Sequence, residues 1–270
     1  MPAMDKLFAG SIPEIYDTCL VPLIFQAYAT DLARRVAGAA PAHVLETAAG
    51  TGVVTRALAP LLDARARYIV SDLNQPMLDR AAIRQGEDGR ITWRQADALS
   101  LPFEQESFDA VVCQFGAMFF PDRVSGYREA LRVLKPGGRF LFNVWDRIEE
   151  NDFARIVTDA ASAVFPSDPP RFLARTPHGY HDVGLIEAEL RMAGFTAIEI
   201  MTLQHRSDAP SARSAAIAYC QGTPLRNEIE ARDPKALQTV TDRAAEAIAK
   251  QYGDGPVSGK IQAHIVVARA

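Results

Sequence analysis

The 270-residue sequence predicts an α/β fold built on a doubly wound, mostly parallel sheet. Short apolar runs alternate with stretches of helical spacing, which is typical of parallel strands joined by helices. The first run ends in a turn of small residues that opens a helix, and the second ends in an acidic residue about twenty positions later. Strands are expected at residues 42–47, 67–72, 91–95, 108–114 and 138–145.

Residues 1–40 precede the first strand and are expected to form an N-terminal helical cover. Apolar and aromatic side chains from Tyr16 to Tyr28 recur at the spacing of one helix face. Ligands of doubly wound sheets bind at the carboxyl ends of the strands. We therefore expect this cover to fold over the ligand cleft.

The segment at 44–52, Val-Leu-Glu-Thr-Ala-Ala-Gly-Thr-Gly, predicts a nucleoside site. An apolar strand leads into a tight turn whose free backbone amides open a helix. Gly50 and Gly52 allow a ligand to approach the backbone closely. Asp72, which ends the second strand, is placed to bind ribose hydroxyls. The segment lacks the third glycine of the dinucleotide fingerprint, so the turn alone does not identify the nucleoside.

The remainder of the chain is expected to surround this core, which spans residues 41–147. Residues 148–182 are rich in proline and aromatic residues and are expected to form a substrate cap segment. Residues 183–270 are expected to complete the core sheet, with a helical insertion at about 207–258. We expect a single domain overall.

Composition favours a small-molecule enzyme. The net charge is −4 and the arginines are interspersed with acids, so no basic surface for nucleic acid is expected. The three cysteines, Cys19, Cys113 and Cys220, form no Cys-x-x-Cys pair, which argues against a disulfide framework and a zinc site. No apolar run approaches the ~20 residues that span a bilayer. We expect a cytoplasmic protein without a bound metal or a membrane span.

Five motifs, taken in order, resemble those of a known family. They are the segment at 44–52, Ser-Asp-Leu-Asn at 71–74, Gln-Ala-Asp-Ala at 95–98, Phe-Asp-Ala-Val-Val at 108–112 and Leu-Arg-Val-Leu-Lys-Pro-Gly-Gly at 131–138. Over most of its length the chain is similar to the class I S-adenosylmethionine-dependent methyltransferases. The resemblance implies a Rossmann-like sheet of seven strands with an antiparallel last strand and a helical cap. It also implies S-adenosylmethionine as cofactor and S-adenosylhomocysteine as product.

The resemblance also implies which residues contact the cofactor. Glu46 would lie near the methionine amino end, and Gly50 and Gly52 under the cofactor. Ala48 stands where the family usually has glycine, which restricts the backbone of the loop. The ribose, adenine and methionine contacts would come from Asp72, Leu73, Met77, Asp97, the Ala98 amide and Gln114.

The implied reaction is in-line attack of an acceptor atom on a methyl group carried by sulfur. Pre-organisation of the two reactants can supply about 7–11 kcal/mol, so a dedicated base is optional. If a base acts, the candidates are Tyr16, His178, Tyr180 and His181, with Tyr28 as a further possibility. His178 and His181 could instead have a structural role or bind a metal.

An aromatic segment after the fourth strand suggests the nature of the acceptor. Residues 114–122 read Gln-Phe-Gly-Ala-Met-Phe-Phe-Pro-Asp and would line the acceptor pocket. Together with the Gly-Tyr-His-Asp motif at 179–182 in the cap segment, this segment resembles the small-molecule, quinone-biosynthesis-like branch of the family. We expect a small hydrophobic or aromatic acceptor. Its pocket residues would be Tyr28, Phe115, Phe119 and Phe172.

Two alternatives stay open. A non-catalytic protein that binds S-adenosylmethionine or S-adenosylhomocysteine would need the same cofactor residues and no acceptor site. An NAD(P)-dependent oxidoreductase could share the glycine turn and Asp72, although the chain contains no Tyr-x-x-x-Lys.

Overall fold

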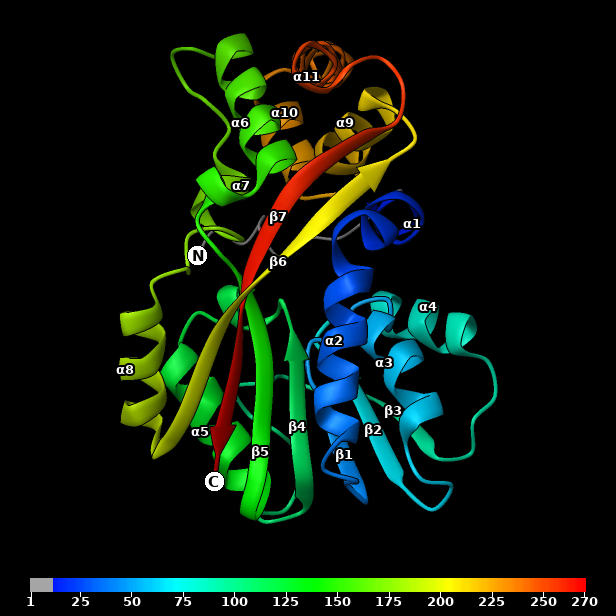
Figure 1. Cartoon of the computed structure of the whole chain (residues 1–270), viewed down its shortest axis with the longest axis vertical. Coiled ribbons are helices and arrows are strands. Elements are labelled where there is room, and N and C mark those ends of the chain that lie inside the picture. The colour runs from blue at the N-terminus through cyan, green and yellow to red at the C-terminus, as the bar shows by residue number, and fades with distance from the viewer. Residues whose placement is uncertain (1–11) are drawn as a thin grey trace. The chain divides into compact units, whose positions relative to one another are not determined.

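The computed structural model describes residues 12–270, which form two compact units (Figure 1). The sheet unit comprises Gln26–Val144, His181–Thr202 and His264–Ala270, and the helical unit comprises residues 12–25, Trp145–Tyr180 and Leu203–Ala263. Residues 1–11 of the expected N-terminal cover lie outside the described residues. The segment boundaries given above and the single domain stay predictions.

The sheet has seven strands in the order β3-β2-β1-β4-β5-β7-β6, with the first five parallel to one another and the last strands antiparallel. The predicted seven-stranded, mostly parallel sheet with an antiparallel last strand is confirmed. Residues of β6 and β7 belong to both units. The strands are β1 (His43–Glu46), β2 (Arg67–Asp72), β3 (Ile91–Gln95), β4 (Phe108–Gln114), β5 (Leu134–Trp145), β6 (Ala197–Ala209) and β7 (Val257–Arg269).

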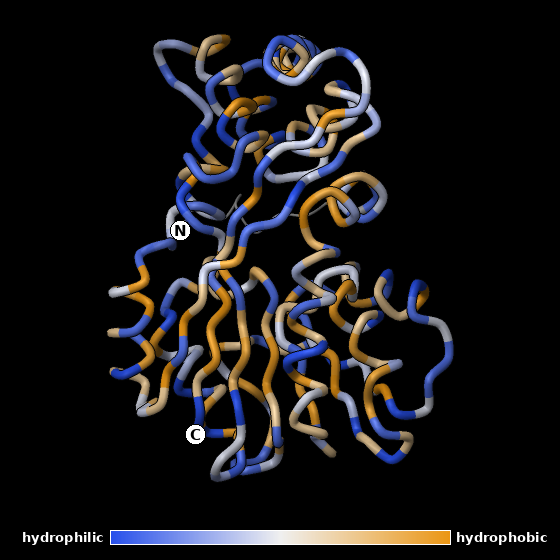
Figure 2. Tube along the Cα trace, viewed as in Figure 1, coloured by the Kyte–Doolittle hydropathy of each residue, from blue (hydrophilic) through white to orange (hydrophobic). Residues whose placement is uncertain are grey.

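The centre of the sheet forms because its strands are apolar on both faces. Val44 and Leu45 of β1 and Val111 of β4 are fully buried. Strands covered on both sides favour such continuous apolar runs over an alternating pattern. Figure 2 shows the central strands of the sheet unit as largely hydrophobic. Because β1 pairs in parallel with both β2 and β4, the carboxyl ends of these three strands meet at one edge.

Helices of the sheet unit begin and end at residues suited to those positions. Asp122 accepts a hydrogen bond from Ser125 N (3.0 Å) at the start of α5, and Asp182 accepts one from Leu185 N (3.0 Å) at the start of α8. Gly194 ends α8 with a left-handed backbone (φ 112°). The helices are α2 (Gln26–Ala37), α3 (Val53–Leu58), α4 (Gln75–Gln85), α5 (Arg123–Val133) and α8 (Val183–Ala193), with short 3₁₀ turns at Ala59–Leu61 and Ala117–Phe119.

The helical unit is held together by α11, which packs against α9 and α6. Val240, Ala244 and Ile248 recur on one side of α11 and are fully buried, as expected of an amphipathic helix. Its elements are α1 (Ile12–Ile15), the π-helical segment η2 (Tyr16–Phe25), a 3₁₀ turn (Ile148–Glu150), α6 (Asp152–Val164), α7 (Phe172–Arg175), α9 (Ala212–Gln221), α10 (Leu225–Arg232) and α11 (Leu237–Tyr252).

Candidate active site

The loop between β1 and α3 has an unusual backbone. Ala48, Gly50 and Gly52 all have positive φ angles, of 51°, 56° and 76°. The left-handed region is accessible to glycine at little cost but costs other residues roughly 1–2 kcal/mol. Ala48 therefore adopts the backbone conformation that a glycine would favour at this position. A Cβ atom on Gly52 would lie 2.9 Å from Ala81 Cβ, so the loop approaches α4 closely.

Asp72 connects this loop to the end of β2 through hydrogen bonds. Its Oδ2 accepts a hydrogen bond from Gly50 N (2.8 Å), and its Oδ1 accepts one from Asn74 N (2.7 Å). The side chain is buried, and burial raises the pKa of the carboxyl group above its usual value despite these hydrogen bonds. Asp72 thus lies beside Gly50, and its role as a ribose-binding carboxylate stays a prediction.

Beside Asp72, Thr51 has a buried side chain whose Oγ1 has no hydrogen-bond partner among the described residues. Buried polar atoms in native structures are usually satisfied. A nucleoside cofactor with hydroxyl and amino groups therefore suits this loop chemically.

Glu46 is enclosed by residues that the sequence did not single out. The hydroxyl of Thr55 in α3 donates to Glu46 Oε2 (2.7 Å), and the hydroxyl of Tyr68 in β2 donates to the same oxygen. The side chain is 1% exposed, and burial raises the pKa of the carboxyl group to about 7. Tyr68 and Glu46 lie on one face of the sheet because Val44, two residues before Glu46, pairs with Tyr68. A tyrosine directly before the apolar residues Ile69 and Val70 of β2 is the sequence signal of this contact.

The expected adenine residues come from two adjoining segments. Ala96 N donates to Asp72 O (3.1 Å), and Gln95 Nε2 donates to Leu73 O (2.8 Å), so residues 72–73 and 95–96 lie side by side. Leu73 is 45% exposed, whereas Met77 is buried. Asp97 is exposed and accepts a hydrogen bond from Leu99 N (2.9 Å), and Ala98 is half-buried.

A strained aromatic residue, Phe115, directly follows the end of β4. Phe115 has a φ angle of 49°, which is uncommon for a bulky side chain. Its N–H lies 3.1 Å from the carbonyl oxygen of Asn143 and 2.9 Å from Asn143 Oδ1. The Phe115 ring packs edge-on against Tyr28, with centroids 5.4 Å apart. Gln114, just before it, is half-buried, and Phe119 lies in the following 3₁₀ turn.

The helical unit contains the other acceptor candidates, two of them in one aromatic cluster. Ring centroids are 5.2 Å apart for Tyr16 and Phe25, 5.9 Å for Phe25 and Trp145, and 5.9 Å for Trp145 and His178. His178 is buried, and its Nδ1 lies 2.8 Å from the carbonyl oxygen of Asp146. A carbonyl only accepts, so Nδ1 carries the proton in this contact. Phe172 and Tyr180 are also buried in this unit.

His181 belongs to the sheet unit, although it lies three residues after His178 in the sequence. The expected acceptor residues thus divide between the units, with Tyr28, Phe115, Phe119 and His181 in the sheet unit. Among residues 12–270, no three histidine, cysteine, aspartate or glutamate side chains gather as a metal site. No helix in this part of the chain is long and apolar enough to cross a membrane.

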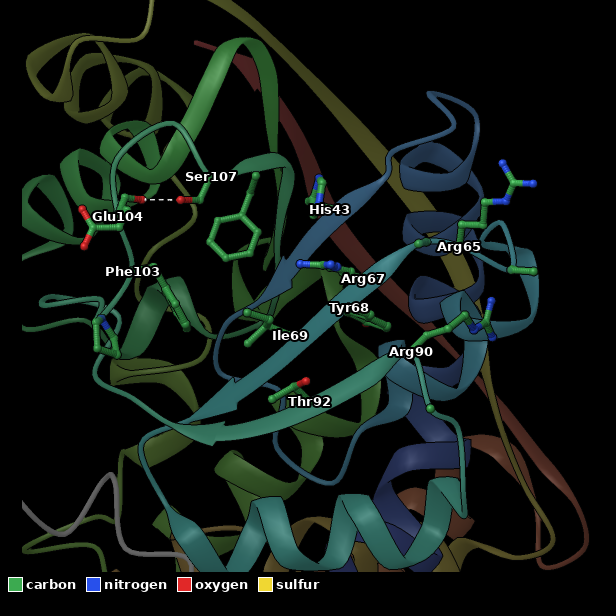
Figure 3. A pocket seen from close by; sticks show the side chains of 15 residues that line it. His43, Arg65, Arg67, Tyr68, Ile69, Arg90, Thr92, Phe103, Glu104 and Ser107 are labelled. Carbon is green, nitrogen blue, oxygen red and sulfur yellow. Dashed lines mark hydrogen bonds between the residues drawn. The ribbon is translucent and has the colours of Figure 1, made fainter.

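A groove of about 860 Å³ lies elsewhere in the sheet unit, at the amino ends of the parallel strands (Figure 3). His43, Arg67, Thr92 and Phe108 lie at the first or second positions of β1 to β4, and Phe103 comes from the β3–β4 connection. That connection, residues 96–107, contains no helix. None of the expected cofactor residues lines this groove.

Known proteins share this arrangement of motifs and strands. Residues 45–142 match a family model described as a methyltransferase domain. A demethylmenaquinone methyltransferase from Clavibacter sepedonicus is 31% identical over 204 residues, which cover 68% of this chain and 80% of that protein. The chain belongs to the S-adenosylmethionine-dependent methyltransferases.

Other similar proteins agree with the assignment of this chain to the methyltransferase family. A ubiquinone/menaquinone biosynthesis C-methyltransferase UbiE from Pseudomonas aeruginosa is 29% identical over 58% of this chain and 66% of its own length. Two solved structures share the fold. The YcgJ protein from Bacillus subtilis has a TM-score of 0.58 at 22% identity, covering 90% of this chain and 98% of its own. Phosphoethanolamine N-methyltransferase 2 from Haemonchus contortus, in complex with S-adenosyl-L-methionine, has a TM-score of 0.61 at 19% identity, covering 98% and 58%.

The comparisons confirm several predictions made from the sequence. The enzyme is a class I, quinone-biosynthesis-like methyltransferase whose cofactor is S-adenosylmethionine and whose product is S-adenosylhomocysteine. These relatives support neither the non-catalytic binding protein nor the NAD(P)-dependent oxidoreductase. The individual site residues and the cytoplasmic location stay predictions.

Proposed function

We propose that the enzyme methylates a small, hydrophobic aromatic acceptor of the quinone-precursor class at a ring carbon. The name of the Clavibacter sepedonicus relative supports this acceptor class, and that of the Pseudomonas aeruginosa relative supports carbon as the methylated atom. The observation that carries the proposal is the contact between the cofactor loop and the aromatic segment. A Cβ atom on Gly116 would lie 2.5 Å from Ala48 Cβ, so the segment after β4 adjoins the loop after β1.

The sheet unit would hold the cofactor at this edge. Asp72 would accept hydrogen bonds from the ribose hydroxyls, and the positive-φ loop at 48–52 would let the methionine end approach the backbone. Glu46 and Gln114 would face the methionine end of the cofactor. The adenine would lie against Leu73 and Met77, with Asp97 and the Ala98 amide at the ring edge.

When bound, S-adenosylmethionine supplies a methyl group on positively charged sulfur, which makes the methyl carbon a strong electrophile. The chain's own task is to orient the acceptor and exclude water. Phe115 and Phe119 would stack on an aromatic acceptor, because flat rings favour offset or edge contacts with one another. Orientation of this kind can contribute about 7–11 kcal/mol without a proton transfer.

Carbon methylation of a hydroxylated ring also releases a proton from the acceptor. A hydroxylated ring becomes more nucleophilic at carbon when its hydroxyl loses a proton. Turnover should therefore fall at low pH, where the substrate hydroxyl is protonated.

The test is an acceptor-dependent methylation assay. Purified enzyme is incubated with S-adenosylmethionine and one acceptor, either reduced short-chain demethylmenaquinone, a catechol or phosphoethanolamine. S-adenosylhomocysteine is quantified, and the product is analysed by NMR to locate the methyl group. We expect turnover with the reduced quinone and a new carbon–methyl bond. Turnover with phosphoethanolamine alone, or methylation at oxygen, would contradict the proposed acceptor or atom.

A further inference from the structure

The carboxyl group of Glu46 is surrounded on three sides by elements of the sheet unit. Tyr68 in β2 and Thr55 in α3 donate to its Oε2, and Arg56 of α3 acts on it through its positive charge. The charge of Asp72 at the end of β2 has the opposite effect to that of Arg56, because it raises the pKa of Glu46. Cys113 in β4 is close enough for the charge of Glu46 to affect the pKa of its thiol.

These neighbours oppose each other in setting the charge of Glu46. Burial favours the neutral acid and raises the pKa of the carboxyl group to about 7, whereas the hydroxyl of Tyr68 lowers the pKa more than Thr55 or Arg56 does. Tyr68 is itself fully enclosed, and its own pKa lies well above 10, so it stays a donor across the physiological range. The tyrosine therefore favours the carboxylate form over the acid.

We propose that Tyr68 is a positioning residue, whose hydroxyl holds the Glu46 side chain as a carboxylate oriented to attract the ammonium group at the methionine end of the cofactor. This inference rests on the proposed placement of Glu46 at that end. Glu46 ends β1 at the start of the loop that carries Ala48, Gly50 and Gly52, so its charge lies at the expected binding edge. The affinity for the cofactor should then change with pH as this carboxyl group titrates.

The direction in which cofactor affinity changes with pH follows from the charge of the Glu46 carboxyl group. Below a pH of about 7, the carboxyl group is protonated and offers the ammonium group no negative charge. Above it, the carboxylate attracts the ammonium group. Affinity should therefore rise as the pH passes through the pKa, and removal of the tyrosine hydroxyl should move this rise to higher pH.

Two readouts test the proposal. In the free protein, the infrared carbonyl band of protonated Glu46, assigned by its loss in Glu46→Gln, is followed from pH 5 to pH 9. Separately, calorimetric titration measures the Kd for S-adenosylhomocysteine over the same range. Tyr68→Phe removes only the hydroxyl. Tyr127→Phe is the matched control, because Tyr127 is a buried tyrosine of the same unit that packs against Phe142.

In Tyr68→Phe, both midpoints should move upward by about one to two pH units, as expected when a charged group loses a hydrogen bond. The control should leave both midpoints unchanged. If Tyr68→Phe does not fold, site-specific 3-fluorotyrosine at residue 68 serves instead. Its more acidic hydroxyl is a stronger donor and should move both midpoints downward.

The outcomes separate this proposal from the proposed function. An unshifted infrared midpoint in the Tyr68 variant overturns the role of Tyr68. A shifted infrared midpoint with an unshifted binding curve shows that Glu46 does not act on the cofactor, which also overturns the positioning role. Absence of S-adenosylhomocysteine binding by the folded wild type at every pH would instead reject the cofactor site itself.

Discussion

A Cβ atom placed on Gly116 would lie 2.5 Å from the Cβ of Ala48 and 2.7 Å from the Sγ of Cys113. Ala48 carries a methyl group at a position where the family usually has glycine, and its backbone is left-handed. The methyl group fits because residue 116, across the loop edge, has no side chain. The two positions therefore share one space that holds a single methyl group.

This relationship predicts that Gly116→Ala is destabilising and that Ala48→Gly partly restores stability. Overpacking of this kind typically costs about 1–3 kcal/mol in the free energy of unfolding. A double-mutant cycle measured by chemical denaturation gives the coupling between the two sites. Gly89→Ala is the control, because nothing lies within 4 Å of a Cβ atom there. Additive effects of the Ala48 and Gly116 changes would show that they do not share space.

Asp72→Ala should weaken S-adenosylhomocysteine binding strongly. Hydrogen bonds to a charged group contribute about 1.5–3 kcal/mol each, so loss of two ribose contacts predicts an affinity at least about 100-fold lower. The variant also leaves Gly50 N without its acceptor, so the melting temperature should fall. Calorimetry measures the affinity, and Asp79→Ala on the exposed side of α4 is the control. Affinity within a few fold of the wild type would remove Asp72 from the ribose site.

The strands and turn at the expected cofactor edge were predictable from sequence because their signals are local. An apolar strand, a small-residue turn and an acid at the next strand end lie within one βαβ unit, and their order identified the family. The position of Asp72 beside Gly50 follows directly from the parallel pairing of β1 and β2.

The contacts that the sequence did not predict depend on distant pairs. The Tyr68 and Glu46 contact requires the strand register, because a shift of one residue would turn Tyr68 to the other face. The fit of Ala48 depends on Gly116, far along the chain. His178 and His181 are close in sequence, yet the chain passes from one unit to the other between them. Spacing alone could not separate these two histidines.

The buried carboxyl group of Glu46 predicts a pH dependence of stability. Its pKa is raised in the folded protein from 4.5 to about 7, so the folded state holds the proton more tightly than the unfolded state. Stability from this group is present at low pH and falls as the pH rises from about 4.5 to about 7, by about 3 kcal/mol in total.

Glu46→Gln cannot ionise, and its amide oxygen can still accept from Tyr68 and Thr55. The variant should therefore gain stability relative to the wild type as the pH rises through this window. Urea denaturation at pH 5 and pH 8 measures the difference. A difference between variant and wild type that is the same at both pH values would show that Glu46 titrates alike in the folded and unfolded states.

Phe115 should affect the acceptor more than the cofactor. Replacement of Phe115 by leucine keeps an apolar side chain but removes the edge contact with Tyr28 and the flat surface for an aromatic acceptor. We expect the acceptor KM to rise about tenfold, which corresponds to ~1.4 kcal/mol for the lost ring contact, with the Kd for S-adenosylhomocysteine nearly unchanged.

Phe108→Leu is the matched control for this prediction. Phe108 is buried at the amino end of β4, the strand that Phe115 directly follows, and also packs edge-on against another ring, that of Phe103 (5.3 Å between centroids). Both changes should lower stability to a similar extent, because each removes a buried aromatic contact. Only Phe115→Leu should change the acceptor KM, since Phe108 lies at the amino end of the strand. Equal KM changes in the two variants would mean that Phe115 acts through stability and does not contact the acceptor.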